Sequence, residues 1–406
     1  MIMRDQAQRL LLPSGVIAIS DKDLQAALAQ AYEAGVRPRC LCREAGVEMY
    51  IARYERYVVK CMPGTGRQHE PQCPSFLTEQ EGEHEAIRAG ADGRFDVLVK
   101  FSLMSRGASP GRSESAHAGD ATRRPRPFTL TALLHLLIDH AQINRWSPPS
   151  QRPYHYLQRE IEKAAANFRI KGHSLSDVLF IPETYDPKRK LEVLERRRHR
   201  VRALLHRNGI QSPRAVLVGE LKHSEPGNLL RRVWLKHMPE RPILVEEKTW
   251  KLATVRFRGA LEALDAGLAV RVLLAAVISD GTGQEIRIES CALVLTTKSW
   301  IPIAGSFELD LHDRLVSGER TFYKPLRYDA SSWTQLPNFV LLDAGPEPVP
   351  LHVIDPWADQ ADIERKRKVA EGSWIWQLDQ PAPPLPHRDT LPIARNENGA
   401  SNECAV

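Results

Sequence analysis

The chain has 406 residues, of which 42% are hydrophobic and 26% are charged, and its formal net charge is +6. These values are ordinary for a globular protein with two or three domains. No apolar run approaches the roughly 20 residues that a membrane helix needs, which excludes a membrane-spanning helix. The N-terminus lacks the pattern of a signal peptide, so we expect a cytoplasmic protein.

The first elements predicted along the chain are a helix and a β-hairpin. Residues 21–35 have the pattern of a helix that Asp21 can cap and that Gly35 ends. Residues 46–62 alternate between polar and apolar side chains and are rich in Val, Ile and Tyr. This pattern predicts two strands with a turn near Glu55.

Four of the six cysteines lie between residues 40 and 73, on both sides of this hairpin. The cytosol keeps thiols reduced, so such clustering indicates a metal site before a disulfide. Cys40 and Cys42 precede the hairpin and His69 and Cys73 follow it, which offers Zn²⁺ two close pairs of soft ligands. Cys61, on the second predicted strand, is a reserve ligand. Four ligands leave no open position, so we predict structural zinc; the alternative is a set of reduced cysteines without metal.

The middle of the chain is predicted to hold a linker and a small helical module. Residues 105–127 mix Gly, Ser, Pro and Arg without large apolar side chains, which is typical of a flexible linker. Residues 129–145 and 154–169 predict two helices, and 174–183 a short strand. This part could be a winged-helix-like DNA-binding domain or an ordinary helical packing module, and the sequence leaves both alternatives open.

The next segment, residues 187–214, is strongly basic, with ten Lys or Arg residues against two acids. Its apolar residues recur at helical spacing, so one face can pack while the other follows a phosphate backbone. The alternative is a solvated helix whose arginines pair with acids elsewhere. The candidate nucleic-acid-binding residues are Arg196, Arg197, Arg198, Arg200 and Arg202.

Beyond residue 214 the pattern changes to alternating strands and helices. The predicted strands are 215–221, 232–238, 269–279 and 285–297, with a helix over 249–264. Residues 306–379 then predict the order α-β-β-β-α-β. This order resembles the core of the PD-(D/E)XK restriction-endonuclease-like fold.

The resemblance implies a Mg²⁺-dependent nuclease site, but its acids are incomplete here. Glu308 or Asp310 can supply the acid of the first helix. Asn338 stands where the Asp after Pro is expected, and His352 where the acid before x-Lys is expected. Neither is a good magnesium ligand, so we expect an inactive nuclease core. The side chains that could substitute are Asp343, Glu364 and Lys366.

Four segments carry a further resemblance: Cys40-Leu-Cys42, MPGTGRQHEPQC at 62–73, LTALLHLLIDHAQINRW at 130–146 and FYKPLRYDASSWTQLPNFVLLD at 322–343. They resemble a bacterial family classed as a domain of unknown function, known from plasmids and integrative elements and marked by N-terminal cysteines. The resemblance implies a mobile-element setting and no particular reaction.

We therefore predict a multi-domain α+β protein. Its predicted parts are a zinc-binding N-terminal module (1–104), a flexible linker (105–128), the helical module (129–186), the basic helix (187–214), an α/β domain (215–380) and a disordered tail (381–406).

The predicted function is nucleic-acid binding, to DNA in particular, by a zinc-stabilised protein of a mobile element that has no catalysis of its own. The alternatives are a divergent metal-dependent nuclease and a protein-interaction scaffold in a conjugation or defence complex. Phosphate-binding GxxxxGK[ST], dinucleotide-binding GxGxxG and hydrolase GxSxG motifs are absent from the sequence.

Overall fold

The structure is a computed structural model, in which the chain forms two compact units. The described residues are 8–19, 21–53, 57–62, 65, 68–70, 73, 75, 86–90, 93–104, 127–207, 213–281, 285–326, 336–345 and 347–388. The first unit comprises Met1–Arg145, Ser150–Asp310 and Leu326–Trp333, and the second comprises Trp146–Pro149, Leu311–Pro325 and Thr334–Val406. Within the described residues, no helix is both long and apolar enough to cross a bilayer.

The first unit begins with a five-stranded sheet in the order β2-β1-β3-β4-β5. Its strands and helix are β1 (Arg9–Leu12), β2 (Gly15–Ala18), α1 (Leu24–Glu33), β3 (Arg39–Cys40), β4 (Val47–Arg53) and β5 (Tyr57–Cys61). The predicted hairpin is confirmed, because β4 and β5 pair antiparallel. The predicted helix is also confirmed, and Gly35 follows it with a φ of +66°. Asp21 accepts a hydrogen bond from the backbone N–H of Asp23 at 3.0 Å, so it closes the turn before the helix rather than capping the helix.

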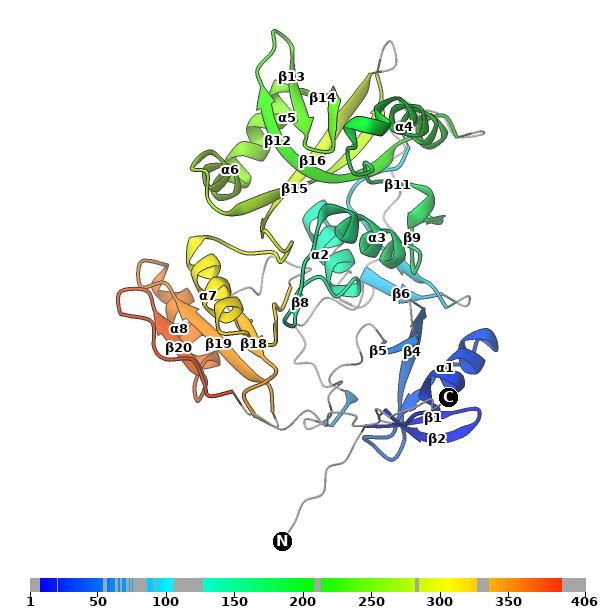
Figure 1. Cartoon of the computed structure of the whole chain (residues 1–406), viewed down its shortest axis with the longest axis vertical. Helices are drawn as coiled ribbons and strands as arrows, with labels where there is room; N and C mark the ends of the chain where they lie inside the picture. Colours follow the sequence, from blue (N-terminus) through cyan, green and yellow to red (C-terminus); the bar gives the residue numbers. More distant parts are fainter. Residues whose placement is uncertain are drawn as a thin grey trace, which may run out of the picture. The chain divides into compact units, whose positions relative to one another are not determined.

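A helical layer with a small mixed sheet follows in the same unit (Figure 1). Its elements are β6 (Ile87–Ala89), β7 (Phe95–Val97), α2 (Leu130–His140), α3 (Tyr154–Ala165), β9 (Phe168–Ile170), β10 (His173–Ser174) and the short 3₁₀ helix η3 (Leu175–Asp177). Thr129 caps α2 by accepting a hydrogen bond from the backbone N–H of Ala132. Both predicted helices are confirmed, whereas most of the predicted linker, residues 105–126, lies outside the described residues.

The longest strands of the unit lie between residues 215 and 297. The elements of this region are β11 (Leu179–Phe180), η4 (Pro187–Arg189), α4 (Lys190–Leu205), β12 (Ala215–Glu225), β13 (Leu230–Leu235), β14 (Met238–Glu246), α5 (Glu247–Arg256), α6 (Arg258–Asp265), β15 (Val270–Asp280) and β16 (Ile286–Thr297). The four predicted strands are confirmed. The single helix predicted over 249–264 is instead two helices, because the chain leaves helical geometry at Phe257.

Five of these strands close on themselves into a barrel, because β12 pairs with both β15 and β13, in addition to the short strand β11. Its first part, from Ala215 to Glu220, pairs with β15, and its second part pairs with β13 after a bulge at Lys222. The remaining pairs are β13 with β14, β14 with β16 in parallel, and β16 with β15. The α5–α6 pair connects β14 to β15 and packs against the barrel strands (Figure 1).

The second unit is built on a sheet in the order β20-β19-β18-β17-β8. The elements of the C-terminal region are β8 (Arg145–Trp146), α7 (Ser306–Ser317), β17 (Phe322–Tyr323), β18 (Phe339–Leu341), β19 (Val349–Ile354), α8 (Gln360–Val369) and β20 (Trp374–Gln377). From α7 onward they follow the predicted order α-β-β-β-α-β. Residues after β20 are held by hydrogen bonds, such as that from Trp374 Nε1 to the carbonyl of Pro384 at 2.8 Å. Residues 389–406 of the predicted tail lie outside the described part of the chain.

Candidate metal centre

The four predicted metal ligands come together in the first unit. The ligand atoms of Cys40, Cys42, His69 and Cys73 all lie within 4.8 Å of one another. The Sγ atoms of Cys40 and Cys73 are 3.6 Å apart, and His69 Nδ1 lies 3.4 Å from Cys42 Sγ and 3.6 Å from Cys73 Sγ. A tetrahedral zinc with Zn–S bonds of about 2.3 Å and a Zn–N bond of about 2.0 Å requires edges of about 3.8 Å and about 3.5 Å. The cluster therefore has the size of a zinc tetrahedron.

Local structure explains why these four residues meet. Cys40 ends β3, a strand flanked by β1 and β4, and Cys42 lies in the turn that follows. Gly46 closes this turn with a φ of +67°, a conformation that glycine adopts without strain. The β4–β5 hairpin then brings the chain back, and a turn in which the backbone N–H of Cys73 donates to the carbonyl of Glu70 at 2.8 Å presents the second pair.

Each sulfur of the cluster accepts a hydrogen bond from an N–H group of the protein. The donors are Gln8 Nε2 to Cys40 at 3.2 Å, the backbone N–H of Glu70 to Cys42 at 3.4 Å and the backbone N–H of Ser75 to Cys73 at 3.4 Å. Such donors stabilise thiolates, which are the form of cysteine that binds metal. These three donors could not be predicted from the sequence, because none belongs to a metal-ligand motif.

Without a metal ion, burial disfavours the thiolate forms of the clustered cysteines. His69 and Cys40 are fully buried, and burial together with the neighbouring sulfurs raises the pKa of the Cys73 thiol to about 12. Burial likewise raises the pKa of Cys42, while burial and the nearby Arg43 lower the pKa of His69. A divalent cation reverses the preference of the cysteines, because it favours thiolates, and it binds the neutral imidazole that burial of His69 already favours. The donor set therefore fits a metal ion.

Cys61 does not enter this geometry. The residue ends β5, but its side chain lies outside the described part of the chain. It stays the reserve ligand that the sequence suggested.

The five candidate arginines of α4 lie in different environments. Arg197 is buried, with 5% of its surface exposed, and it forms an ion pair with Glu240 and donates to the carbonyl of His237 at 2.8 Å. Arg196 contacts Glu183 at 2.8 Å and also pairs with Glu192. These two arginines are therefore engaged within the protein.

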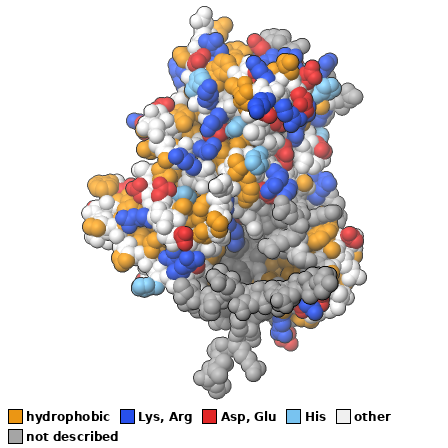
Figure 2. All heavy atoms as spheres, viewed as in Figure 1, with side chains coloured by type: hydrophobic (Ala, Val, Ile, Leu, Met, Phe, Trp, Pro, Cys, Tyr) orange, Lys and Arg blue, Asp and Glu red, His pale blue; other side chains and the backbone are white. Residues whose placement is uncertain are grey.

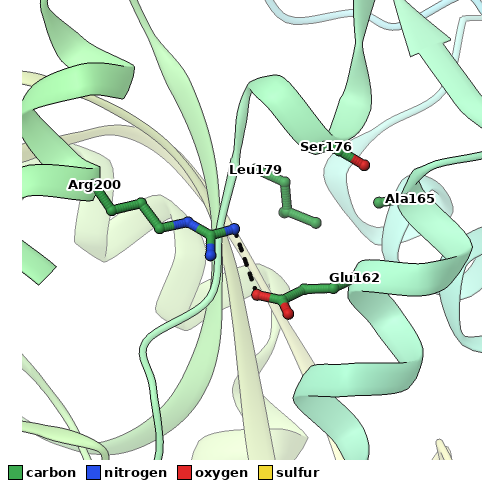
Figure 3. Close-up of a pocket in the computed structure, with 5 residues that line it drawn as sticks. All are labelled: Glu162, Ala165, Ser176, Leu179 and Arg200. Carbon is green, nitrogen blue, oxygen red and sulfur yellow. Dashed lines mark ion pairs between the residues drawn. The ribbon is translucent and has the colours of Figure 1, made fainter. Parts of the chain in front are cut away.

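Arg200 reaches from α4 to Glu162 of α3, with 3.4 Å between Arg200 Nη2 and Glu162 Oε1, above a small hollow (Figure 3). Arg198 and Arg202 are exposed and have no ion pair with any described residue. Figure 2 shows that Lys and Arg side chains are mixed with Asp and Glu side chains on the surface where α4 lies. The arginine run is thus a partly neutralised surface.

The candidate nuclease residues of the second unit are held in structural contacts. Asp343 forms an ion pair with Arg320, with 2.8 Å between Asp343 Oδ1 and Arg320 Nη2. Asn338 Oδ1 accepts a hydrogen bond from the backbone N–H of Val353 at 2.8 Å. His352 is buried beside Lys366, and burial together with that charge lowers the pKa of His352 to about 4.

The other candidates lie elsewhere along α7 and α8. Glu308, in the first unit, is 2% exposed and accepts a hydrogen bond from the backbone N–H of Ala304 at 2.7 Å at the start of α7. Asp310 and Glu364 are exposed. In the described parts of the chain, groups of three or more metal-ligating side chains occur only at Cys40, Cys42, His69 and Cys73.

A comparison with protein families identifies the family to which the chain belongs. The family described as "Protein of unknown function (DUF1173)" matches residues 13–379, which include the metal cluster and α4. The chain belongs to the DUF1173 family. No curated protein matches it. The predicted membership of a family of unknown function is therefore confirmed, while the setting in plasmids and integrative elements stays a prediction.

Proposed function

We propose that Cys40, Cys42, His69 and Cys73 bind one Zn²⁺ ion that stabilises the N-terminal sheet. The observation that carries this proposal is the compact arrangement of the four ligand atoms, all within 4.8 Å of one another. Three sulfurs and one imidazole nitrogen favour zinc over magnesium or calcium, which prefer oxygen ligands. All four positions are filled by protein, so the ion is structural and not catalytic.

The zinc would join two parts of the chain that also contact each other through polar groups, such as the ion pair of Arg43 with Glu70 at 3.1 Å. One is the central strand β3 with its following turn, and the other is the segment around His69 and Cys73. The apolar cluster at this place is small, with Leu10, Val47 and Met49 around the buried cysteines. A small core of this kind is commonly completed by a metal.

Metal analysis tests this proposal directly. Protein purified without chelator should contain about one zinc per chain. Replacement of zinc by Co²⁺ should give intense visible absorption from tetrahedral coordination and a thiolate-to-metal charge-transfer band. Zinc far below one equivalent, together with weak octahedral-type cobalt absorption, would contradict the proposal.

Replacing Gln8 by leucine tests the role of the donor to Cys40. The substitution removes the N–H that stabilises this thiolate but leaves all four ligands, so we expect zinc affinity to fall by about 10- to 100-fold. Competition with a chromophoric chelator measures this change. The same substitution at Gln25, whose amide donates to the carbonyl of Tyr57 away from the cluster, should leave zinc affinity unchanged.

We further propose that the protein binds DNA through the exposed face of α4. The specific support is that Arg198 and Arg202 are exposed without an acidic partner among the described residues, four positions apart on one helix. This spacing places them on the same face, where both can contact phosphates. A DNA-binding role also suits the mobile-element setting that the sequence resemblance implies.

Reversing both charges, with Arg198→Glu and Arg202→Glu, should weaken binding to a 20-base-pair duplex by about tenfold or more and lower the salt slope by about two. Fluorescence anisotropy at several salt concentrations measures both quantities. The matched control is Lys248→Glu with Lys251→Glu, two exposed lysines of α5, which should have little effect. If the unaltered protein fails to bind DNA even at low salt, the protein-interaction scaffold becomes the better hypothesis.

For the second unit we propose a fold of the PD-(D/E)XK type without nuclease activity. Its support is the mixed sheet, in which β18 is antiparallel to β19 and β19 is parallel to β20. The ion pair of Asp343 with Arg320 and the hydrogen bond accepted by Asn338 argue against metal binding there. Cleavage of DNA in the presence of Mg²⁺ or Mn²⁺ that Glu308→Ala abolishes would overturn this proposal.

A further inference from the structure

The barrel of the first unit has the strand order of an OB-fold. Numbered along the chain, its five strands β12 to β16 close in the order 1-2-3-5-4-1, with strands 3 and 5 parallel. A helical segment connects strands 3 and 4, and a bulge lets strand 1 pair on both sides. Barrels of this topology bind oligonucleotides or oligosaccharides on the outer face of strands 2 and 3. The equivalent face here belongs to β13 and β14.

The strand register identifies which side chains share this outer face. Val233 and Leu235 of β13 are fully buried, so their neighbours Arg232 and Trp234 point outward. His223 pairs with Trp234, and Leu244 pairs with Arg232. On the next strand Arg287 pairs with Leu244. An aromatic, an imidazole and two guanidinium groups therefore lie on one side of the barrel.

The rings on this face are arranged for stacking. The rings of His223 and Trp234 lie 6.0 Å apart between centroids with an angle of 25° between their planes. About 43% of the His223 side chain is exposed, and Trp234 is half-buried. Successive bases of a single strand stack on such side-by-side aromatic groups, and stacking tolerates any base.

The charged side chains of this face favour an anionic ligand. Arg232 contacts Glu225 only at 3.7 Å and is half exposed, and the bulge presents Lys222 to solvent. Arg287 and Lys222 have no ion pair with a described residue. These three cations outnumber the acids Glu225 and Glu246 that the register places on the same face, which favours a phosphate backbone over a neutral sugar chain.

We propose that the outer face of β13 and β14 binds single-stranded nucleic acid. Bases stack on Trp234 and His223, and phosphates lie near Arg232, Arg287 and Lys222. This inference deepens the nucleic-acid proposal by naming a single-stranded partner, but it depends on residues distinct from Arg198 and Arg202 of α4.

Fluorescence anisotropy with a labelled 20-nucleotide oligo-dT and a labelled 20-base-pair duplex tests the proposal. Trp234→Ala should weaken oligo-dT binding by about tenfold, the range expected for loss of one stacked base. Lys222→Glu with Arg232→Glu, two exposed positions, should have at least as large an effect and should lower the salt slope, since both cations face solvent. Duplex binding should change much less in these variants.

The control variant Lys248→Glu with Lys251→Glu changes the same charge on α5 and should leave oligo-dT binding intact. Circular dichroism verifies that each variant is folded, and the double charge reversal keeps the test valid if Trp234→Ala unfolds the barrel. Loss of oligo-dT binding only in the α4 variants, or in none, would overturn this inference while leaving the α4 proposal to its own test. Binding of maltoheptaose without binding of oligo-dT would also overturn it.

Discussion

Replacing Cys73 by serine is expected to reduce bound zinc from about one equivalent to a small fraction of that and to unfold the N-terminal module. A serine hydroxyl is a poor zinc ligand at neutral pH, so the substitution leaves three ligands for an ion that needs four. Structural zinc contributes about 10–16 kcal/mol in small zinc domains, and loss of one thiolate removes a large share. Metal analysis after gel filtration and scanning calorimetry with and without chelator measure the two effects.

A control variant at a cysteine outside the cluster separates the effect of losing zinc from the effect of losing a cysteine. Cys291 lies in β16, where burial raises its pKa to about 11, and it is not among the clustered ligands. Cys291→Ala should retain full zinc and the same sensitivity to chelator as the unaltered protein. Cys42→Ser, at a less buried position, should behave as Cys73→Ser does. Full zinc occupancy in Cys73→Ser would refute the proposed coordination.

The four residues of the candidate metal site could be predicted because their pattern is local. Cys40 and Cys42 form one pair, His69 and Cys73 form the other, and the alternating strands between them indicated a hairpin that joins the two. The donor from Gln8 could not be predicted, since it lies 32 residues before Cys40 and reaches the site only through the pairing of β1 with β3. Both β1 and β2 are short strands without a clear alternating pattern.

The basic helix shows a different limit of sequence reasoning. The density of arginine was visible in the sequence, but of the acids that pair with α4 only Glu192 belongs to the helix, and the others come from other segments. Glu183 reaches Arg196, and Glu240 reaches Arg197 from a strand 43 residues away. Only the fold decides that Arg198 and Arg202 remain exposed, so a charge count overestimated the free surface of this helix.

The barrel was equally hidden, although four of its five strands were predicted; no strand was predicted over β14. Alternation and β-branched residues identify a strand, but they do not reveal that β12 pairs with two different neighbours. The bulge at Lys222 changes which residues face outward, so His223 shares a face with Trp234. A nucleic-acid surface on β13 and β14 therefore could not be found by searching for runs of positive charge.

One signal in the sequence was overlooked: Glu220, an acid inside the apolar run AVLVGEL. In the structure Glu220 is 4% exposed. Three basic side chains surround its carboxylate, namely Lys236 at 3.0 Å, Arg271 at 3.2 Å and His237 at 3.4 Å. The Arg271 guanidinium also lies 4.3 Å from the centre of the Trp300 ring, which covers this side of the barrel. A lone acid in a buried strand thus marks a buried ionic network.

Replacing Glu220 by glutamine is expected to destabilise the barrel by about 3–5 kcal/mol. The substitution keeps the size of the side chain but removes the charge, so Arg271 is left as a largely buried cation without a counter-ion. Hydrogen exchange of peptides from β12 and β15 measures the loss locally, because these strands pair through Glu220 and Leu273. Unchanged protection of these strands would show that the network does not stabilise the barrel.

The exposed Glu225 on the same strand provides the matched control. Its side chain is 45% exposed and contacts Arg232 at 3.7 Å, so Glu225→Gln should change stability by no more than about 0.5 kcal/mol. The pH dependence adds a second test. Burial disfavours the ionised carboxyl of Glu220, but His237, Lys236 and Arg271 outweigh burial and lower its pKa. Its contribution is therefore complete above the pKa of an unfolded glutamate and is lost as pH falls through the lower folded value. Glu220→Gln should remove this part of the acid sensitivity, whereas Glu225→Gln should keep it.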